Sequence, residues 1–298
     1  MIASIIVGYK NDDLTIKFVR EQLPKIKRDN VVVVVNNAAT DESNQHLANE
    51  LNGCVIEDVS HSIDISCRFF VINSKDNQGF ARANNQGAKF IQKHFPECEY
   101  LLFTNNDIKI IDDNVVDVLI KKMESVDGIG MITPNIIGLT GARQTPQPYP
   151  DPKKFLKKKI FWLLGHPIRD INYAEEAQEG FHYTFAECFF LVRSKDYAAC
   201  GGMDPATFLY AEGLCFSERM LEIGLRYYFE PSVTIVHENG STTSRSYKEA
   251  KINMMITMAN NYYLKKYRHT SRFVRGGLVI VSKLYSYKME LKRLLHRD

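Results

Sequence analysis

The sequence predicts an α/β protein with a doubly wound, mostly parallel sheet, followed by C-terminal helices. Short apolar runs alternate with helix-like segments over about the first 110 residues, as in sheets with helices on both faces. One run, Val31 to Val35, is five consecutive valines, which is typical of a strand covered on both sides. Polar residues follow each run. They indicate a ligand site, because such sheets bind ligands at the carboxyl ends of their strands.

The elements of the first half follow from this alternation and from turn residues. Gly8 ends the first apolar run, and Asp12 and Asp13 begin a segment whose apolar residues have helical spacing. Thr40 or Asp41 is suited to cap the helix after the valines. In order, the predicted elements are a strand at Ile2 to Val7, a helix from Asp12, a strand at Val31 to Val35, a helix from Asp41, a strand at Arg68 to Asn73, a helix at Phe80 to Phe95 and a strand at Tyr100 to Thr104.

The second half has weaker periodicity. Gly138 to Gln178 is rich in Pro, Gly and Lys, which predicts a long, partly mobile insertion. The other predicted elements are a buried strand at Phe185 to Val192, a helix within Phe208 to Leu225, two short strands at Arg226 to Glu230 and Val233 to His237 on either side of Pro231, and helices from Ser246 onward.

Composition excludes several classes of protein. The chain has 298 residues, of which 45% are hydrophobic, so disordered and disulfide-scaffold proteins are ruled out. A net charge of +3 gives no support for a nucleic-acid partner. The charge is unevenly distributed, however. Thirteen Lys or Arg and three acidic residues from Arg245 to Asp298 give this stretch +10, which leaves −7 on the 244 residues before it.

The six cysteines form no CxxC pair, which favours free buried thiols in a reducing compartment over a metal knuckle. No run reaches the roughly 20 apolar residues of a membrane span. We therefore predict a cytoplasmic protein. Any contact with the membrane is expected to be peripheral, at the inner face of the cell membrane.

Two basic stretches suggest that contact. Lys153 to Leu164 combines five lysines with Phe155, Phe161 and the single Trp162, a composition typical of an interfacial amphipathic segment. The basic tail carries further Lys and Arg residues, which attract anionic lipid. A solvated helix face is the alternative interpretation of both stretches.

Asp107 is the strongest single candidate for a metal-binding residue. It follows the apolar strand ending at Thr104, where a carboxylate can bind a hard divalent cation. The alternative is a turn aspartate that bonds its own backbone. His237 ends a later predicted strand and precedes a Gly/Ser/Thr loop, so it is a candidate second ligand or phosphate contact.

Six short stretches then occur in one order that is familiar from a known family. The stretches are Ser4 to Lys10, Val34 to Asp41, Asn77 to Gly87, Thr104 to Asp107, Phe208 to Glu212 and Val236 to Ser241. With these stretches in this order, the sequence resembles glycosyltransferase family 2, inverting nucleotide-sugar enzymes of GT-A fold, and in particular the bacterial rhamnosyltransferase-like branch that builds surface polysaccharides.

This resemblance implies a metal-dependent transfer from a nucleotide-sugar, of UDP or dTDP type, to a saccharide or lipid-linked oligosaccharide acceptor. It implies a GT-A domain over 1–244, with a nucleotide half at 1–110 and an acceptor half at 111–244, and a basic helical extension at 245–298. Asp107, with His237 beside it, would hold Mn or Mg. The residues implied to bind the nucleotide are Tyr9, Asn11, Asn36, Asn77, Gly79, Arg82, Asn85, Asn105 and Asn106.

Two departures from the family pattern matter. Asn36 replaces the usual Asp that bonds the nucleotide base, and an amide both donates and accepts hydrogen bonds. The usual pair of acids after Phe-Leu-Tyr is Glu212-Gly213 here, although the second acid is commonly the catalytic base. We therefore predict Glu212 as the base, with Glu187 or Glu218 as alternatives.

Other functions remain open at this stage. Gly213 also fits a catalytically impaired member that only binds sugar nucleotide or glycan. A nucleotidyltransferase would share the doubly wound sheet, but the Gly8 to Asp12 stretch is not the Gly-rich, basic loop expected to grip a triphosphate.

Overall fold

The computed structural model of this chain describes residues 1–58, 63–166, 173–238 and 248–295. These residues form one ten-stranded sheet in the order β3-β4-β2-β1-β5-β9-β7-β10-β6, with β8 paired to β10. The strands are β1 Ile2–Gly8, β2 Asn30–Asn37, β3 Cys54–Ile56, β4 Phe69–Ser74, β5 Tyr100–Thr104, β6 Ile108–Ile110, β7 Ile129–Gly138, β8 Gly180–His182, β9 Phe189–Arg193 and β10 Arg226–His237.

The sheet is mostly parallel, as predicted. β3, β4, β2, β1 and β5 run parallel to their neighbours, and β10 runs parallel to β7. β9 lies antiparallel between β5 and β7, and β6 and β8 pair antiparallel with β10. The carboxyl ends of β1, β2, β4 and β5 therefore share one edge of the sheet.

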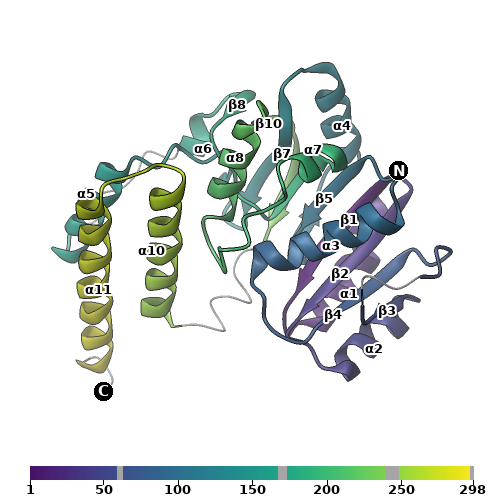
Figure 1. Cartoon of the computed structure of the whole chain (residues 1–298), viewed down its shortest axis with the longest axis horizontal. Coiled ribbons are helices and arrows are strands. Elements are labelled where there is room, and N and C mark those ends of the chain that lie inside the picture. The colour runs from purple at the N-terminus through teal and green to yellow at the C-terminus, as the bar shows by residue number, and fades with distance from the viewer. Residues whose placement is uncertain (59–62, 167–172, 239–247, 296–298) are drawn as a thin grey trace.

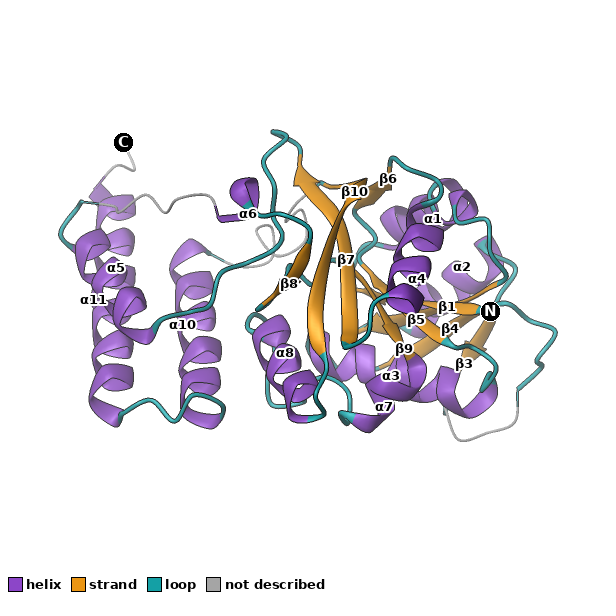
Figure 2. Cartoon of the chain, turned by 90° about the horizontal axis from the view of Figure 1, so that it is seen from above, coloured by secondary structure: helices purple, strands orange, loops and turns teal. Residues whose placement is uncertain are grey.

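Helices cover both faces of the sheet (Figure 2). The hydrophobic core divides accordingly, with Phe18 and Leu119 on one face and Phe90 and Phe216 on the other. The helices are α1 Asp12–Glu21, α2 Asp41–Glu50, α3 Phe80–His94, α4 Val115–Ser125, α5 Pro152–Leu163, α6 Tyr173–Glu176, α7 Ser194–Ala199, α8 Glu212–Glu222, α10 Glu249–Lys266 and α11 Arg272–Leu295.

The region around Pro231 differs from the prediction of two short strands. β10 is a single strand from Arg226 to His237 whose register with β7 shifts between Glu230 and Thr234. Proline has no N–H to donate to the neighbouring strand. The shift in register places Pro231 outside the hydrogen-bonded pairs, so the strand continues past it. Thr234 restores the pairing, and its N–H also donates to Asp112 at 2.6 Å.

The predicted insertion at 138–178 contains the helix α5, which coincides with the stretch from Lys153 to Leu164 that was interpreted as an amphipathic segment. Asp151 caps it, because its carboxylate accepts from the N–H groups of Lys153 and Lys154. α5 packs against α11, and Leu156 lies where a side chain at Gly277 would contact it.

α5, α10 and α11 lie side by side, next to α8 and away from the β3 edge of the sheet (Figures 1 and 2). A small core joins them to α8, in which Cys215 packs with Tyr263, Leu264 and Leu278. Among the described residues, no helix has the length and apolar character that crossing a bilayer requires.

Candidate active site

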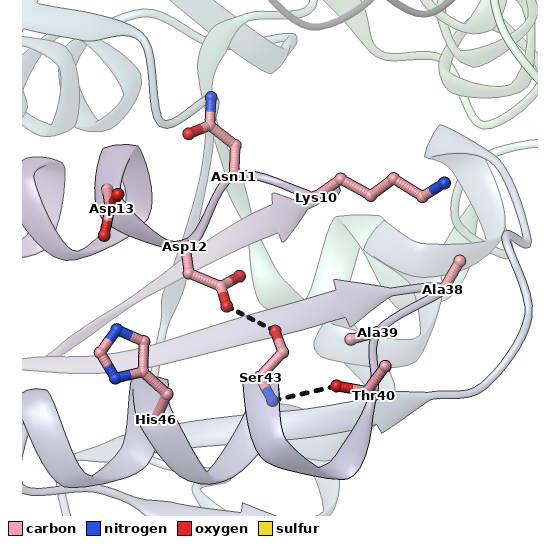
Figure 3. A pocket seen from close by; sticks show the side chains of 9 residues that line it. All are labelled: Lys10, Asn11, Asp12, Asp13, Ala38, Ala39, Thr40, Ser43 and His46. Atoms are coloured by element: carbon pink, nitrogen blue, oxygen red, sulfur yellow. Dashed lines mark hydrogen bonds between the residues drawn. The ribbon is translucent and has the colours of Figure 1, made fainter.

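An open pocket lies at the carboxyl ends of β1 and β2, between the first turns of α1 and α2 (Figure 3). The Ser43 hydroxyl donates to Asp12 at 2.6 Å, and the Ser43 N–H donates to the capping hydroxyl of Thr40 at 3.2 Å. Helix N-termini favour anions. The lining residues are Lys10, Asn11, Asp12, Asp13, Ala38, Ala39, Thr40, Ser43 and His46.

Asn11 lines this pocket, and Tyr9 precedes it at the end of β1, where the Lys10 ammonium lies 5.4 Å from the Tyr9 ring centre. Asn36 is buried beneath the pocket, and its amide donates to Ser43 and Asn44, both at 2.9 Å. Asn36 thus fixes Ser43, which itself lines the pocket.

The segment from Asn77 to Asn85, which was predicted to bind the nucleotide, contacts the loop before α8 at Met203, Pro205 and Phe208. Gly79 has φ +79°, and a Cβ there would lie 2.4 Å from the carbonyl oxygen of Phe208, so this close approach requires glycine. Arg82 donates to the Pro205 carbonyl at 2.7 Å. Asn85 donates to the Met203 carbonyl and accepts from its N–H.

Asn77 lies at the start of this contact, where its side-chain oxygen accepts from Asn37 at 2.9 Å and from the Gly79 N–H at 3.0 Å. These bonds link the end of β2 to the start of α3. Gly79, Arg82 and Asn85 contact the loop that leads to Glu212, and Asn77 holds the start of their segment against β2.

The turn after β5 carries Asp107. The Asn105 N–H donates to the Cys188 carbonyl at 2.8 Å, and the Asn106 amide donates to Thr15 at 2.8 Å. The Asp107 carbonyl accepts from the Glu238 N–H at 2.9 Å, which brings the end of β10 to this turn. As a result, His237 Nε2 lies 3.3 Å from Asp107 Oδ1.

This pair fits a divalent cation. Asp107 Oδ1 is buried and has no hydrogen-bond partner, and such an atom is suited to a hard cation. His237 Nδ1 lies 2.9 Å from Gln144 Oε1. If Nδ1 carries the proton, Nε2 faces Asp107 as a free ligand. No group of three His, Cys, Asp or Glu side chains that could hold a metal occurs within the described ranges, so the remaining ligands would come from substrate and water.

Without a cation, His237 holds a proton. Burial lowers its pKa, but the Asp107 carboxylate 3.3 Å away and the Cys188 thiol raise it more, to about 10. The Gly/Ser/Thr loop predicted after His237 begins at Asn239, and residues 239–247 lie outside the described residues.

Glu212 begins α8, after two residues in an unusual backbone conformation. Tyr210 and Ala211 have φ of 74° and 63°, which is uncommon for residues other than glycine and is frequent at functional sites. The Glu212 side chain is only 3% exposed, and its Oε1 has no hydrogen-bond partner.

The sequence analysis named Glu187 only as an alternative to Glu212, and the structure places the two carboxylates together. Glu187 Oε1 accepts from the Gly213 N–H at the start of α8. Burial and the neighbouring Glu187 charge raise the pKa of Glu212 to about 8. Burial also raises the pKa of Glu187, which the Gly213 N–H partly offsets. Glu218, the other alternative, accepts from Tyr183 and Arg268.

Replacing Glu212 by glutamine is expected to stabilise the protein at pH 8 but not at pH 5. The folded-state pKa lies above the unfolded value, so the folded protein holds the proton more tightly and loses stability as pH rises toward 8. We expect the variant's Tm to exceed the wild-type Tm by roughly 3 °C or more at pH 8. Glu222→Gln, on the exposed side of α8, is the control. An equal effect at both pH values would contradict the prediction.

Comparison with known proteins gives the family. The profile of glycosyl transferase family 2 matches residues 4–192, well over half of the chain. The chain belongs to this family. No curated protein sequence matches it.

Solved structures show the same fold. S. aureus TarS 1–349 in complex with UDP-GlcNAc has a TM-score of 0.54 at 15% identity, over 94% of this chain and 70% of TarS 1–349. GalNAc-T7 with UDP, GalNAc and Mn²⁺ has a TM-score of 0.54 at 10% identity, over 99% of this chain and 58% of its own. A longer S. aureus TarS structure gives 0.52 at 15% identity, over 90% of this chain and 44% of its own. The fold of this family 2 chain is thus GT-A, as the resemblance implied.

Proposed function

We propose that this family 2 glycosyltransferase moves a sugar, with inversion, from a UDP- or dTDP-linked donor to a saccharide or lipid-linked oligosaccharide acceptor in bacterial surface polysaccharide synthesis. The observation that carries the proposal is the meeting of Asp107 and His237 in the turn after β5, which pairs with β1. The complex of S. aureus TarS with UDP-GlcNAc and the complex of GalNAc-T7 with UDP, GalNAc and Mn²⁺ support the donor class.

Each part of the site has a role in this proposal. The pocket between α1 and α2 binds the nucleoside, with Tyr9 and Asn11 at its entrance and Asn36 beneath it. Asp107 and His237 hold Mn or Mg, which when bound neutralises charge on the leaving diphosphate. The acceptor binds beside the two carboxylates at the start of α8, and these supply the general base.

A ligand-detected NMR screen of UDP-, dTDP- and GDP-sugars with manganese tests the donor. We expect manganese-dependent binding of UDP- or dTDP-sugars and release of the nucleoside diphosphate on incubation. Manganese-dependent binding with no consumption of any donor would favour the catalytically impaired binding protein instead. Absence of binding would contradict the proposed donor class.

We further propose that the C-terminal helices attach the enzyme to an anionic membrane surface. Five exposed apolar side chains on α11 are spaced so that they share one face of the helix: Phe273, Ile280, Leu284, Tyr287 and Leu291. Lys283 and Lys288 are exposed nearby on the same helix. An apolar face bordered by lysines suits anionic lipid.

α5 contributes less to such a surface than its sequence suggested. Trp162 faces Tyr285 of α11 at 5.9 Å between ring centres, and Lys159 is buried and donates to Asn253 of α10. Ile160, Phe161 and Leu164 remain exposed. Part of the predicted amphipathic segment is thus used for packing within the protein.

Flotation with liposomes tests the attachment. The triple variant Ile280→Ser, Leu284→Ser, Tyr287→Ser is expected to lose most of its flotation with anionic liposomes, because it removes the centre of the α11 face. Ile65→Ser removes an exposed apolar side chain from the nucleotide half and should float like the wild type. Unchanged flotation of the triple variant, or equal flotation with neutral liposomes, would contradict the attachment.

A further inference from the structure

Glu187 occupies the space that a side chain at position 213 would need. A Cβ on Gly213 would lie 2.5 Å from Glu187 Oε1 and 2.9 Å from Cδ, closer than real Cβ atoms approach other heavy atoms. A side chain at 213 and the observed Glu187 conformation therefore exclude each other. Glycine at 213 leaves this space to a carboxylate that comes from a different part of the chain.

This carboxylate lies between the two parts of the site. Thr104 of β5 pairs with Phe189 of β9, and the Asn105 N–H donates to the Cys188 carbonyl at 2.8 Å. Glu187 is the next residue of this strand extension, beside the turn that carries Asp107. On its other side, Glu187 accepts from the Gly213 N–H of α8. A single residue thus bridges the candidate metal turn and the start of α8.

Accessibility distinguishes the two glutamates. A general base must reach the acceptor hydroxyl within hydrogen-bond distance. Glu212 is 3% exposed, with one oxygen enclosed and unpartnered, whereas Glu187 is only partly buried. Glu187 is therefore the more exposed of the two residues and the better placed for contact with an acceptor.

Given the glycosyl transfer proposed above, we propose that Glu187 is the general base of the reaction and that Glu212 is its buried positioning partner. The acceptor hydroxyl gives its proton to Glu187 as its oxygen forms the bond to the anomeric carbon. The bond from that carbon to the diphosphate oxygen breaks, and its electron pair leaves with the nucleoside diphosphate. Glu187 then returns the proton to solvent.

The charges around the pair agree with these roles. Two neighbouring carboxylates oppose each other's ionisation, and the pKa of Glu212 of about 8 keeps this residue largely protonated at neutral pH. The Gly213 N–H stabilises the ionised form of Glu187. Because each carboxylate opposes the ionisation of the other, the pair is expected to share one proton and one negative charge, which leaves one base.

Turnover of the full-length chain tests the assignment, with the donor sugar that the wild type consumes and manganese present. Glu187→Gln is expected to lower kcat by roughly 10² to 10⁴-fold, because glutamine can still accept from Gly213 but takes no proton. Glu212→Gln should lower kcat less and leave the acidic limb of the pH profile near its wild-type position, because Glu212 is already neutral at the pH where Glu187 ionises. The UDP–manganese Kd should stay within about twofold in both variants.

A relocation variant separates a catalytic role from a structural one. Glu187→Gly with Gly213→Asp moves the carboxylate onto α8 and removes the clash, so it should recover part of the activity lost in Glu187→Gln. Retention of more than about a tenth of kcat by Glu187→Gln would overturn the assignment, as would a larger loss in Glu212→Gln. Loss of UDP binding in Glu187→Gln would indicate a structural role and would also overturn it.

The pairing of Glu187 with Glu212 can also be tested without any enzyme turnover, so its test does not depend on the proposed function. NMR of glutamate Cδ, labelled with ¹³C, follows the titration of Glu212 directly. In Glu187→Gln the pKa of Glu212 should fall, because the neighbouring negative charge is gone. An unchanged Glu212 titration would overturn the pairing, whereas failure of the wild type to consume any donor would contradict the proposed transfer and not the pairing.

Discussion

Replacing Asp107 by alanine is expected to abolish manganese-dependent nucleotide binding. Asp107 offers a buried oxygen without a hydrogen-bond partner, next to His237. Loss of a metal ligand removes several kcal/mol of interaction with the diphosphate, which corresponds to at least about a hundredfold weaker binding of UDP. Calorimetric titration of UDP, with manganese and with EDTA, measures the effect. Binding in EDTA should be similar in the variant and the wild type.

Two further variants make this result specific. Asp107→Asn keeps the shape of the side chain but removes its charge, and it should also lose most of the manganese effect. Asp113→Ala removes an exposed aspartate that pairs with Lys27, and it should bind UDP like the wild type. Full manganese dependence in Asp107→Ala would show that the cation is held elsewhere.

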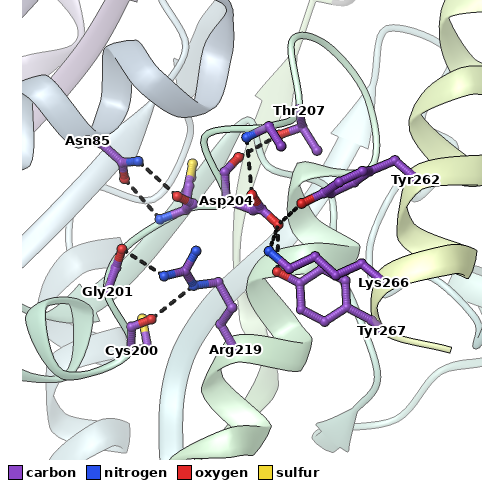
Figure 4. A network of polar contacts seen from close by, with 11 residues as sticks. Asn85, Cys200, Gly201, Asp204, Thr207, Arg219, Tyr262, Lys266 and Tyr267 are labelled. Carbon is purple, nitrogen blue, oxygen red and sulfur yellow. Dashed lines mark hydrogen bonds and ion pairs between the residues drawn. The ribbon is translucent and has the colours of Figure 1, made fainter. Parts of the chain in front are cut away.

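Replacing Asp204 by alanine is expected to lower the free energy of unfolding by about 3 kcal/mol. Asp204 is 2% exposed, and its Oδ2 accepts from the Tyr262 and Tyr267 hydroxyls and from the Lys266 ammonium at 2.7 to 2.8 Å (Figure 4). The substitution leaves these three donors of α10 and its C-terminal end without their acceptor. Urea unfolding at neutral pH measures the loss.

The pH dependence gives a second check on Asp204. Burial raises its pKa, but hydrogen bonds from Lys266, Tyr267, Ala206 and Tyr262 lower it more, to about 2. The folded-state pKa lies below the unfolded value, so this stabilisation is present above about pH 4 and is lost as pH falls toward 2. The stability difference between wild type and Asp204→Ala should therefore shrink at low pH.

Asp204→Asn serves as the matched variant for this network. It retains an acceptor oxygen and should lose less stability than Asp204→Ala. Both variants should bind UDP with manganese like the wild type, because Asp204 lies outside the pocket and the metal turn. A loss of less than about 1 kcal/mol in Asp204→Ala would contradict a role for this carboxylate in fixing α10.

Elements with a strong local pattern were predicted closely. β5 occupies Tyr100–Thr104 as expected, and α3 ends one residue before the predicted Phe95. Five valines and the cap at Thr40 likewise fixed β2 and α2 within a few residues. These signals lie within a few residues of each other in the chain. Short edge elements such as β3 and β6 lack such a pattern and were missed. The helix α4 and the interior strand β7 were not predicted either.

The acidic pair shows why the site was predicted less completely. Glu187 and Gly213 are 26 residues apart, and neither residue alone signals the other. The Glu187 side chain would clash with a side chain at position 213 only because β9 and α8 are packed together. The order of polar stretches identified the region and the candidate metal ligand Asp107, but it left the base open among three glutamates.

The sequence by itself determined the doubly wound sheet, the polar ends of its strands and the family, because periodicity, caps and ordered short stretches are local properties of a chain. The tertiary structure alone decided that Glu187 fills the space left by Gly213. It also decided that α5 packs on α11 across more than 100 residues. Both depend on which surfaces meet in space, because a local pattern shows which face of a segment is apolar but not which distant segment covers it.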